Sequence, residues 1–154
     1  MPFPKHLLLA LGLFALSGST PDPTLEADRL SVSLSLGGTQ ELTIDMGPVY
    51  AHKRYLIAGS ASGTFPGTLR EATRVPLNFD AYSELVIERA NGNHYRGFSG
   101  YLNAQGKATA KLTMPPSEST QLVGHVYHHA AVVIDPKTGT VIEATNPVEV
   151  LLLP

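Results

Sequence analysis

The stretch LSVSLSLGGTQELTIDM, residues 30–46, decides the fold class because its apolar residues recur at every second position. In the first half, leucine and valine alternate with serine; in the second half, residues 42, 44 and 46 are apolar and residues 41, 43 and 45 are polar. Successive side chains of a strand point to opposite faces, so this period of two predicts two strands, each with one buried face. The stretch therefore predicts an all-β protein.

The turn between these strands, Gly37-Gly38, leaves their pairing open. A two-residue turn places Leu34 opposite Glu41, so that an apolar and a charged side chain share one face. A three-residue loop aligns Leu34 with Leu42, but it requires a left-handed conformation from Thr39. The remaining arrangement puts the two strands in different sheets of a sandwich, and we favour it.

A hairpin is predicted around residues 104–106, where register and turn chemistry agree. Residues 107–114 alternate between polar and apolar side chains, and the loop ends in Gly106, where a three-residue loop requires positive φ. We therefore predict a structural role for Gly106. This loop gives two apolar pairs: Leu102 with Ala108, and Phe98 with Leu112.

Further short runs of strand-forming residues, separated by turn residues, occupy the rest of the chain. They are 55–58, 75–79, 85–87, a histidine-bearing run ending at 134, 141–144 and 148–153, with a long loop at 59–74. No helix longer than one turn, near 117–121, is expected. The spacing predicts an Ig-like or jelly-roll-type β-sandwich of about seven to nine strands, as a single domain over residues 29–154.

The last strand, 148–153, is apolar almost throughout, so an unpaired edge there would be a sticky surface. We expect it to pair inside its own sandwich. The alternative is that it, or the strand at 30–36, adds to the sheet of a neighbouring subunit or of another extracellular protein.

The N-terminal residues have the features of a cleavable signal peptide. Lys5 precedes an apolar run at 7–16 that is short for a membrane span, and small residues follow up to Ser19. Residues 1–19 are therefore predicted as the signal peptide, and the Pro-rich, acidic residues 20–28 as a linker. This predicts export to the cell surface or the extracellular space, with the periplasm as the alternative.

Composition narrows the classes of function. The net charge is −2 with both signs scattered and no basic run, which argues against nucleic acid as a partner. The chain contains no cysteine, which excludes thiol catalysis and zinc–thiolate sites. No segment after the leader has the length of a membrane helix.

Three histidines lie within five positions of the run LVGHVYHHAAVVID, residues 122–135. On a strand, His125 and His129 share one face while His128 points to the other. At about 3.3 Å per residue, His125 and His129 are about 13 Å apart, too far to bind one ion together. A metal site would need His52 or His94 and a carboxylate from elsewhere. We predict no metal or other cofactor, and expect one of His128 and His129 to be buried and hydrogen-bonded to backbone while the other faces solvent.

Other catalytic patterns are incomplete, so no catalytic residue is predicted. The segment GSASG at 59–63 has Ala61 where a nucleophile elbow needs its serine, and it is predicted as a flexible loop. Asn78 and Asp80 with Glu84 offer oxygens to calcium, but without the Asp-rich, Gly-turned loop of a dedicated site. Glu84 and Glu88 flank the predicted strand at 85–87 and share one strand face, where we expect solvated side chains rather than a carboxylate pair for hydrolysis.

Carbohydrate binding is the alternative function, because exposed aromatic faces stack on sugar rings. The chain contains no tryptophan, so the candidate ligand-binding residues are tyrosines. They are Tyr50, Tyr55, Tyr82, Tyr95 and Tyr101.

Two short motifs resemble those of a group of bacterial secreted modules with no assigned activity. One is a GGTQ-type first turn at 37–40; the other runs from His129-Ala130 through Asp135 to Asn146-Pro147-Val148. The resemblance implies an extracellular β-sandwich in which His129 and Asn146 are structural positions. The chain departs from the pattern at residues 125 and 131, where the group has an aliphatic and an aromatic residue.

Together these observations predict a secreted, non-enzymatic structural or adhesive module that binds itself or other extracellular proteins through edge strands. Self-assembly into an extracellular fibre or surface layer is part of this hypothesis. A module that binds polysaccharide is the alternative, and a metal-dependent enzyme is a third hypothesis.

Overall fold

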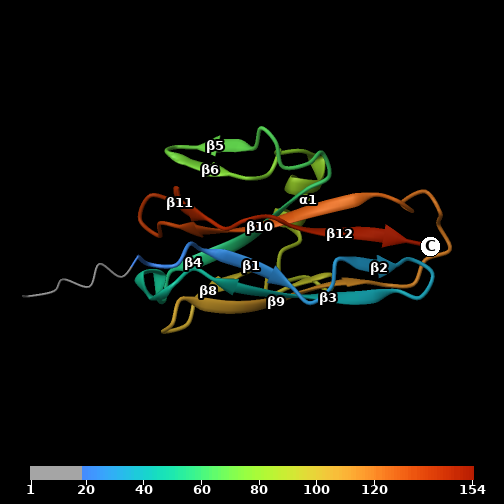
Figure 1. Cartoon of the computed structure of the whole chain (residues 1–154), viewed down its shortest axis with the longest axis horizontal. Helices are drawn as coiled ribbons and strands as arrows, with labels where there is room; N and C mark the ends of the chain where they lie inside the picture. The colour runs from blue at the N-terminus through green and yellow to red at the C-terminus, as the bar shows by residue number, and fades with distance from the viewer. Residues whose placement is uncertain (1–18) are drawn as a thin grey trace, which may run out of the picture.

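The computed structural model describes residues 19–154, which form two packed β-sheets with a smaller third layer on one of them (Figure 1). The predicted all-β sandwich is therefore confirmed. The predicted signal peptide lies outside the described residues except for Ser19.

The first sheet contains four strands in the order β1-β3-β9-β7. Their bounds are β1 (Thr24–Ala27), β3 (Gly38–Asp45), β9 (Lys107–Met114) and β7 (Tyr95–Arg96). β3 and β9 pair along their whole length, with Glu41 opposite Lys111 and Asp45 opposite Lys107 on the solvent face. Lys111 Nζ lies 2.7 Å from a Glu41 oxygen, and Lys107 Nζ lies 3.0 Å from an Asp45 oxygen. These exposed pairs fix the register more than they stabilise the fold.

The second sheet has the order β2-β12-β10-β4-β8, and β11 also pairs with β10. Their bounds are β2 (Ser31–Ser33), β12 (Val148–Leu153), β10 (Val126–Ile134), β4 (Arg54–Ser60), β8 (Ser99–Tyr101) and β11 (Val141–Ala144). β10 is central and carries four consecutive buried apolar residues, Ala130–Val133. Two of them face the main core between the sheets, and the other two face the third layer.

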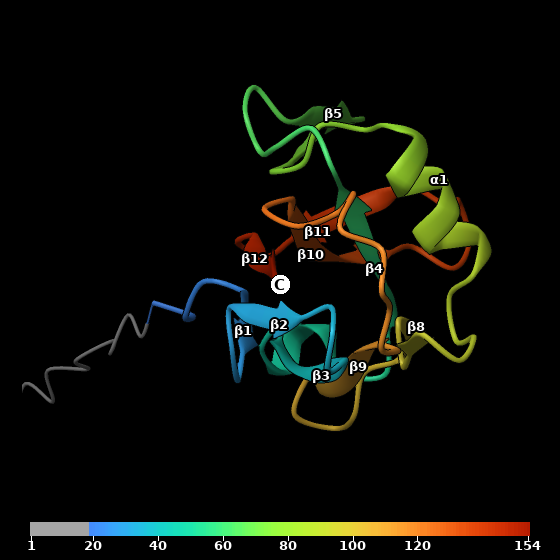
Figure 2. The ribbon, with the colours of Figure 1, turned by 90° about the vertical axis from the view of Figure 1, so that its right-hand side faces the viewer.

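The third layer is the hairpin of β5 (Thr68–Arg70) and β6 (Thr73–Val75), which lies over the outer face of the second sheet (Figure 2). Helix α1 (Ala81–Glu88) packs beside β4, and a short 3-10 helix, η1 (Pro48–Tyr50), precedes that strand. Gly59 makes the helix contact possible, because a Cβ there would come within 2.6 Å of the Tyr82 ring and 3.0 Å of Val86.

Three predicted elements are wrong. Residues 81–88 form a helix where a strand was predicted at 85–87, because the Asp80 side chain caps the first turn. The predicted linker at 20–28 contains β1, which pairs with β3. The predicted strand at 30–36 is reduced to β2, with Leu30 and Leu36 exposed. Short strands and the third layer also raise the number of strands in the described residues above the predicted nine.

The predicted hairpin pairing across residues 104–106 is wrong as well, although Gly106 does have a positive φ of 75°. β9 pairs with β3 and with Tyr95 and Arg96 of β7, whereas β8 crosses to the other sheet and pairs with β4. Phe98 and Leu102 are thereby buried, with exposed fractions of 0% and 1%. A Cβ on Gly106 would overlap the Gly47 carbonyl, so glycine is required there.

Two pairing expectations are confirmed. β2 and β3 belong to different sheets, and the last strand, β12, pairs within the molecule, antiparallel with β10 and parallel with β2.

Gln40, which is fully buried on β3, crosses between the sheets: its side-chain amide donates to the Arg29 carbonyl at 2.7 Å and to the Glu149 carbonyl at 2.9 Å.

Asparagine side chains close two sheet edges. On β1, Leu25 N–H donates to Asn146 Oδ1 and Asn146 Nδ2 donates back to the Leu25 carbonyl, both at 2.9 Å. On β8, the Ser99 N–H donates to Asn91 Oδ1 at 3.2 Å and Asn91 Nδ2 donates to the Ser99 carbonyl at 2.9 Å. Each amide makes the pair of hydrogen bonds that an incoming strand would make at that residue.

Candidate functional site

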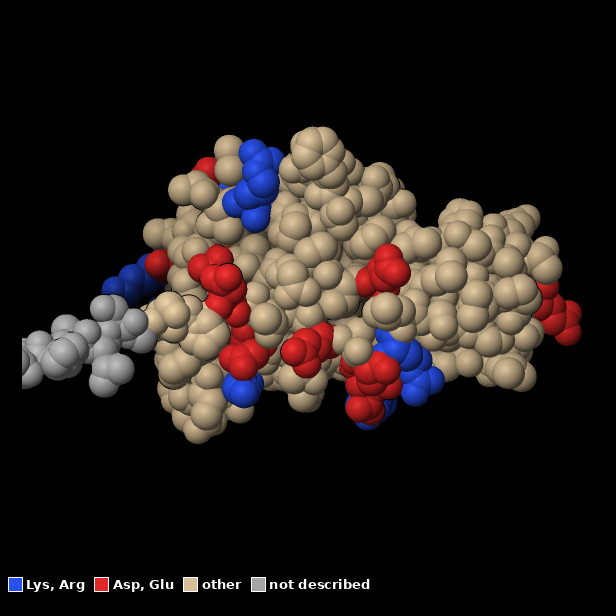
Figure 3. All heavy atoms as spheres, viewed as in Figure 1, with Lys and Arg blue, Asp and Glu red and all other residues tan. Residues whose placement is uncertain are grey.

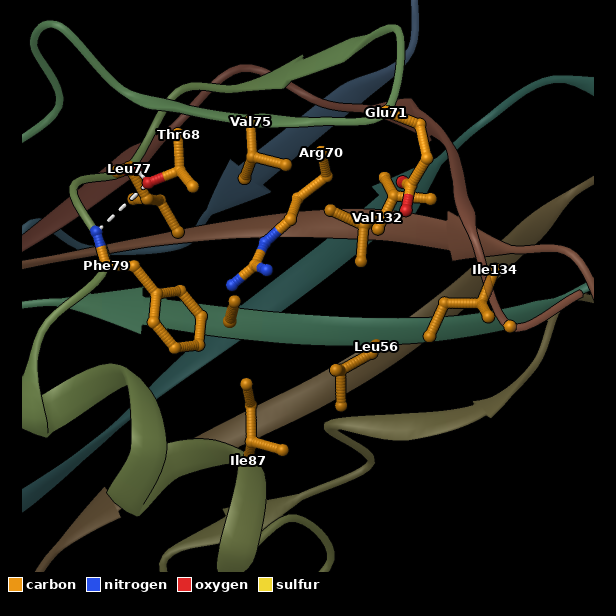
Figure 4. Close-up of a pocket in the computed structure, with 13 residues that line it drawn as sticks. Leu56, Thr68, Arg70, Glu71, Val75, Leu77, Phe79, Ile87, Val132 and Ile134 are labelled. Atoms are coloured by element: carbon orange, nitrogen blue, oxygen red, sulfur yellow. Dashed lines mark hydrogen bonds between the residues drawn. The ribbon is translucent and has the colours of Figure 1, made fainter.

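An apolar pocket of about 260 Å³ lies between the hairpin β5–β6, helix α1 and the outer face of the second sheet (Figure 4). Its floor is aliphatic because every second residue of β4 and of β10 points outward here, where the hairpin covers them incompletely. The floor and walls comprise Leu56, Ala58, Val75, Leu77, Val132, Ile134 and Val141. The volume approaches the lower end of the range for small-molecule pockets.

Asp80 holds together the elements that frame the pocket. One carboxylate oxygen accepts from the backbone N–H groups of Tyr82 and Ser83 at the start of α1, at 2.9 and 3.1 Å. The other oxygen accepts from the backbone N–H groups of Ala61 and Ser62, both at 2.9 Å, and from the Ser62 hydroxyl at 2.6 Å. Asp80 therefore joins the loop after β4 to the start of the helix.

The pKa of Asp80 reflects this role. Burial raises the pKa of the carboxyl, but the hydrogen bond from the Ser62 hydroxyl and those from three backbone N–H groups outweigh it and lower the pKa to about 2. Asn78, another of the three residues considered for calcium, is also engaged: its amide accepts from Gly67 N–H and donates to the carbonyls of Ser62 and Phe65. These side chains shape the loop at 61–79.

Two charged residues stand at the pocket. Arg70 reaches from β5 between Val132 and Phe79, with its guanidinium carbon 4.9 Å from the centre of the Phe79 ring (Figure 4). Glu71 follows in the tight turn of the hairpin with a positive φ of 50°, and it points into the pocket at the end nearer Ile134. Within residues 19–154, neither side chain has an ion-pair partner.

His129 lies in the main core with no exposed surface, as predicted for one of the histidine pair. Its partner differs from the prediction: Nε2 lies 2.9 Å from the Tyr82 hydroxyl rather than against backbone. Burial lowers the pKa of His129 to about 3, and His128 adds to the shift. His128 is on the opposite face and is partly exposed, with Nε2 3.9 Å from a Glu149 oxygen.

The structure distributes the predicted tyrosines over several environments. Tyr55 and Tyr95 are core residues with exposed fractions of 4% and 8%. Tyr82 packs on Tyr127 and the buried histidine, and the hydroxyl of Tyr50 donates to a carboxylate at 3.0 Å. Tyr101 is 73% exposed on β8. The five side chains therefore do not form one exposed aromatic surface.

The pocket residues were not among the predicted site residues. Arg70 and Glu71 fall inside what was predicted as a loop at 59–74, and Phe79 and Ile87 were assigned to strands. Two signals in the sequence point to this region. Asp80 with Ser83 three positions later is a helix-start pattern, and the continuous apolar run at 130–134 is typical of a strand covered on both faces.

Charged side chains on the face shown in Figure 3 form small groups of mixed sign rather than one extended patch. No helix within residues 19–154 combines the length and apolar character needed to cross a membrane. In the same part of the chain, no cluster of three or more His, Asp or Glu side chains is placed to hold a metal ion.

These features define an all-β sandwich with a third layer that carries an apolar pocket. No family model matches the chain, and neither does any curated protein. Among solved structures, the E. coli chaperone DraB is similar to it with a TM-score of 0.43 and 10% sequence identity. The match covers 86% of this chain and 55% of the chaperone chain, so the chain spans about half the length of that structure.

Proposed function

We propose that the chain is a secreted, non-enzymatic adhesive or structural module that holds a partner at its pocket face. The pocket face is the pocket together with the apolar side chains at its rim, Phe79 and Ile87, which are 43% and 37% exposed. The observation that carries the proposal is an open aliphatic pocket beside two charged residues without ion-pair partners in the described chain. Open apolar surface of this kind is typical of binding sites.

The side chains that suggested chemistry support a binding role. Asp80 is hydrogen-bonded to residues 61–62 and to the start of α1, Asn78 is hydrogen-bonded to residues 62–67, and His129 is fully buried in the core. None of the three opens into the pocket, whose lining is mainly aliphatic. The pocket is thus suited to hold an apolar group rather than to transfer protons.

The amide caps on β1 and β8 disfavour these two edges as binding surfaces. A strand added to β1 or β8 would first have to displace the amide of Asn146 or Asn91. Export, which the proposal includes, rests on the signal-peptide features of residues 1–19. The resemblance to bacterial secreted modules supports the same location.

The test has two parts. Cell fractionation of a producing bacterium should place the chain outside the cytosol. Fluorescently labelled protein should then bind to the surface of these cells, and Phe79→Ala should weaken that binding about fivefold or more. Leu36→Ala is the matched control, because Leu36 is 81% exposed and is not one of the residues that line the pocket. A chain retained in the cytosol, or equal binding by both variants, contradicts the proposal.

A further inference from the structure

The pocket combines three kinds of chemistry in a small space. Its floor is aliphatic, Arg70 supplies a cation over that floor, and Glu71 supplies an acceptor at the other end (Figure 4). Thr68, also on the pocket side of the hairpin, is already engaged: its hydroxyl donates to the Leu77 carbonyl at 2.8 Å and accepts from Phe79 N–H at 3.1 Å. The groups left to meet a ligand are therefore the aliphatic floor, the guanidinium and the Glu71 carboxylate.

We infer that the pocket binds the C-terminal residue of a partner polypeptide when that residue has an aliphatic side chain. The aliphatic group lies on the floor, the terminal carboxylate pairs with Arg70, and an N–H group of the peptide donates to Glu71. This inference rests on the proposed function, since it specifies the partner held at the pocket face. Arginine suits the role because its planar guanidinium binds a carboxylate through two parallel hydrogen bonds.

The pair of charges favours a peptide over a simple fatty acid. A fatty acid offers a carboxylate to Arg70, but it has no hydrogen-bond donor for Glu71. A peptide terminus offers both an anion and N–H donors. Phe79 assists by holding the guanidinium through a cation–π contact, which keeps Arg70 over the pocket before a ligand arrives.

The experiment compares two peptides that differ in one group: acetyl-Gly-Ser-Gly-Val-Leu with a free carboxylate, and the same peptide amidated. Binding is followed by methyl NMR of Val75, Leu77 and Val132, which line the pocket. We expect the free acid to bind about fivefold more tightly than the amide, because a charge-assisted hydrogen bond is lost on amidation. Sodium decanoate, below its micelle concentration, is the comparison ligand.

Arg70→Ala should abolish the preference for the free acid, since the cation is gone. Arg74→Ala is the matched control: Arg74 belongs to the same hairpin but lies opposite Leu69 and donates to the Pro66 carbonyl. Ala58→Leu should fill the floor and reduce binding of both peptides, with the melting temperature checked to show that the variant is folded.

Three outcomes overturn the inference: equal binding of acid and amide, a preference that survives Arg70→Ala, or tighter binding of decanoate than of the peptide. These failures are distinguishable from failure of the proposed function. If only the inference about the peptide terminus fails, cell-surface binding that depends on Phe79 would persist, and the pocket would hold a different ligand. Absence of that binding would remove the function itself.

Discussion

His129 lies where three parts of the fold meet. It belongs to β10, its Nε2 is 2.9 Å from the Tyr82 hydroxyl of α1, and its ring stands edge-on to Phe98 at a centroid distance of 5.7 Å. Nδ1 has no hydrogen-bond partner within the described residues. A neutral ring tolerates this site, whereas a charged ring would have to be buried without a counter-ion.

This burial predicts sensitivity to mild acid. The folded pKa of His129, about 3, is below the unfolded value of 6.5, so the unfolded state takes up the proton first. The contribution of His129 to stability is complete above pH 6.5 and is lost as the pH falls from 6.5 toward 3. Between pH 7 and 5, the free energy of unfolding should fall by about 2 kcal/mol from this group. Urea denaturation at the two pH values measures it.

The control for this prediction removes both members of the hydrogen bond. The double change Tyr82→Phe and His129→Leu leaves neither group unpaired in the core, so its effect on the pH dependence is separate from a lost hydrogen bond. The double variant should lose markedly less stability than the wild type between pH 7 and 5. Equal losses in the two proteins would show that His129 does not cause the acid sensitivity.

At the scale of elements, α1 depends on its first turn. Asp80 and Ser83 form a reciprocal capping box, and the Ser83 hydroxyl also donates to the Gly59 carbonyl of β4. The helix is eight residues long, which is too short to be stable alone. Its position therefore comes from the cap and from the burial of Val86 in the main core.

Asp80→Ala should loosen the helix and the adjoining loop together. The loss of an N-cap costs about 1–2 kcal/mol. Hydrogen exchange should accelerate at the backbone N–H groups of Ala61, Ser62, Tyr82 and Ser83, while the N–H groups of β10 stay protected. Glu84→Ala, an exposed change in the same helical turn, should leave these rates unaltered. A uniform acceleration across β10 would instead mean that Asp80 supports the whole sandwich.

How much of this architecture the sequence predicts depends on the length of each element. β3 and β9 are eight residues each, and their strict alternation identified them and their buried faces. β5 and β6 have three residues each, too few for a period to be recognised, and β1 follows two prolines that suggested a linker. The pocket could not be predicted, because Arg70 meets Phe79 only after the hairpin has folded over the second sheet.

At the scale of the whole molecule, side-chain amides cap two of the outer strands of the sandwich, β1 and β8. Asn146 lies between β11 and β12 in one sheet but pairs with β1 of the other, so it both joins the sheets and closes an edge. Asn91, in the loop after α1, caps the edge of β8 with a similar pair of hydrogen bonds, and its backbone has a positive φ of 66°. β8 pairs with only the first three residues of β4, and α1 packs beside the part of β4 that β8 does not reach.

Opening these edges should make the chain associate. Asn146→Ala and Asn91→Gly, where glycine keeps the positive φ without strain, each remove two hydrogen bonds to an edge strand. Each change should cost about 1–2 kcal/mol in stability and expose the N–H and carbonyl of an edge residue. In sedimentation velocity over a range of concentrations, the double variant should form dimers or larger species that the wild type does not form at the same concentration. Asn93→Ala, an exposed change in the same loop as Asn91, is the matched control. A monomeric double variant would mean that the twist and shortness of the edge strands prevent association, so that the amides contribute only stability. A wild type that already assembles through β1 or β8 would show that an incoming strand can displace the amides.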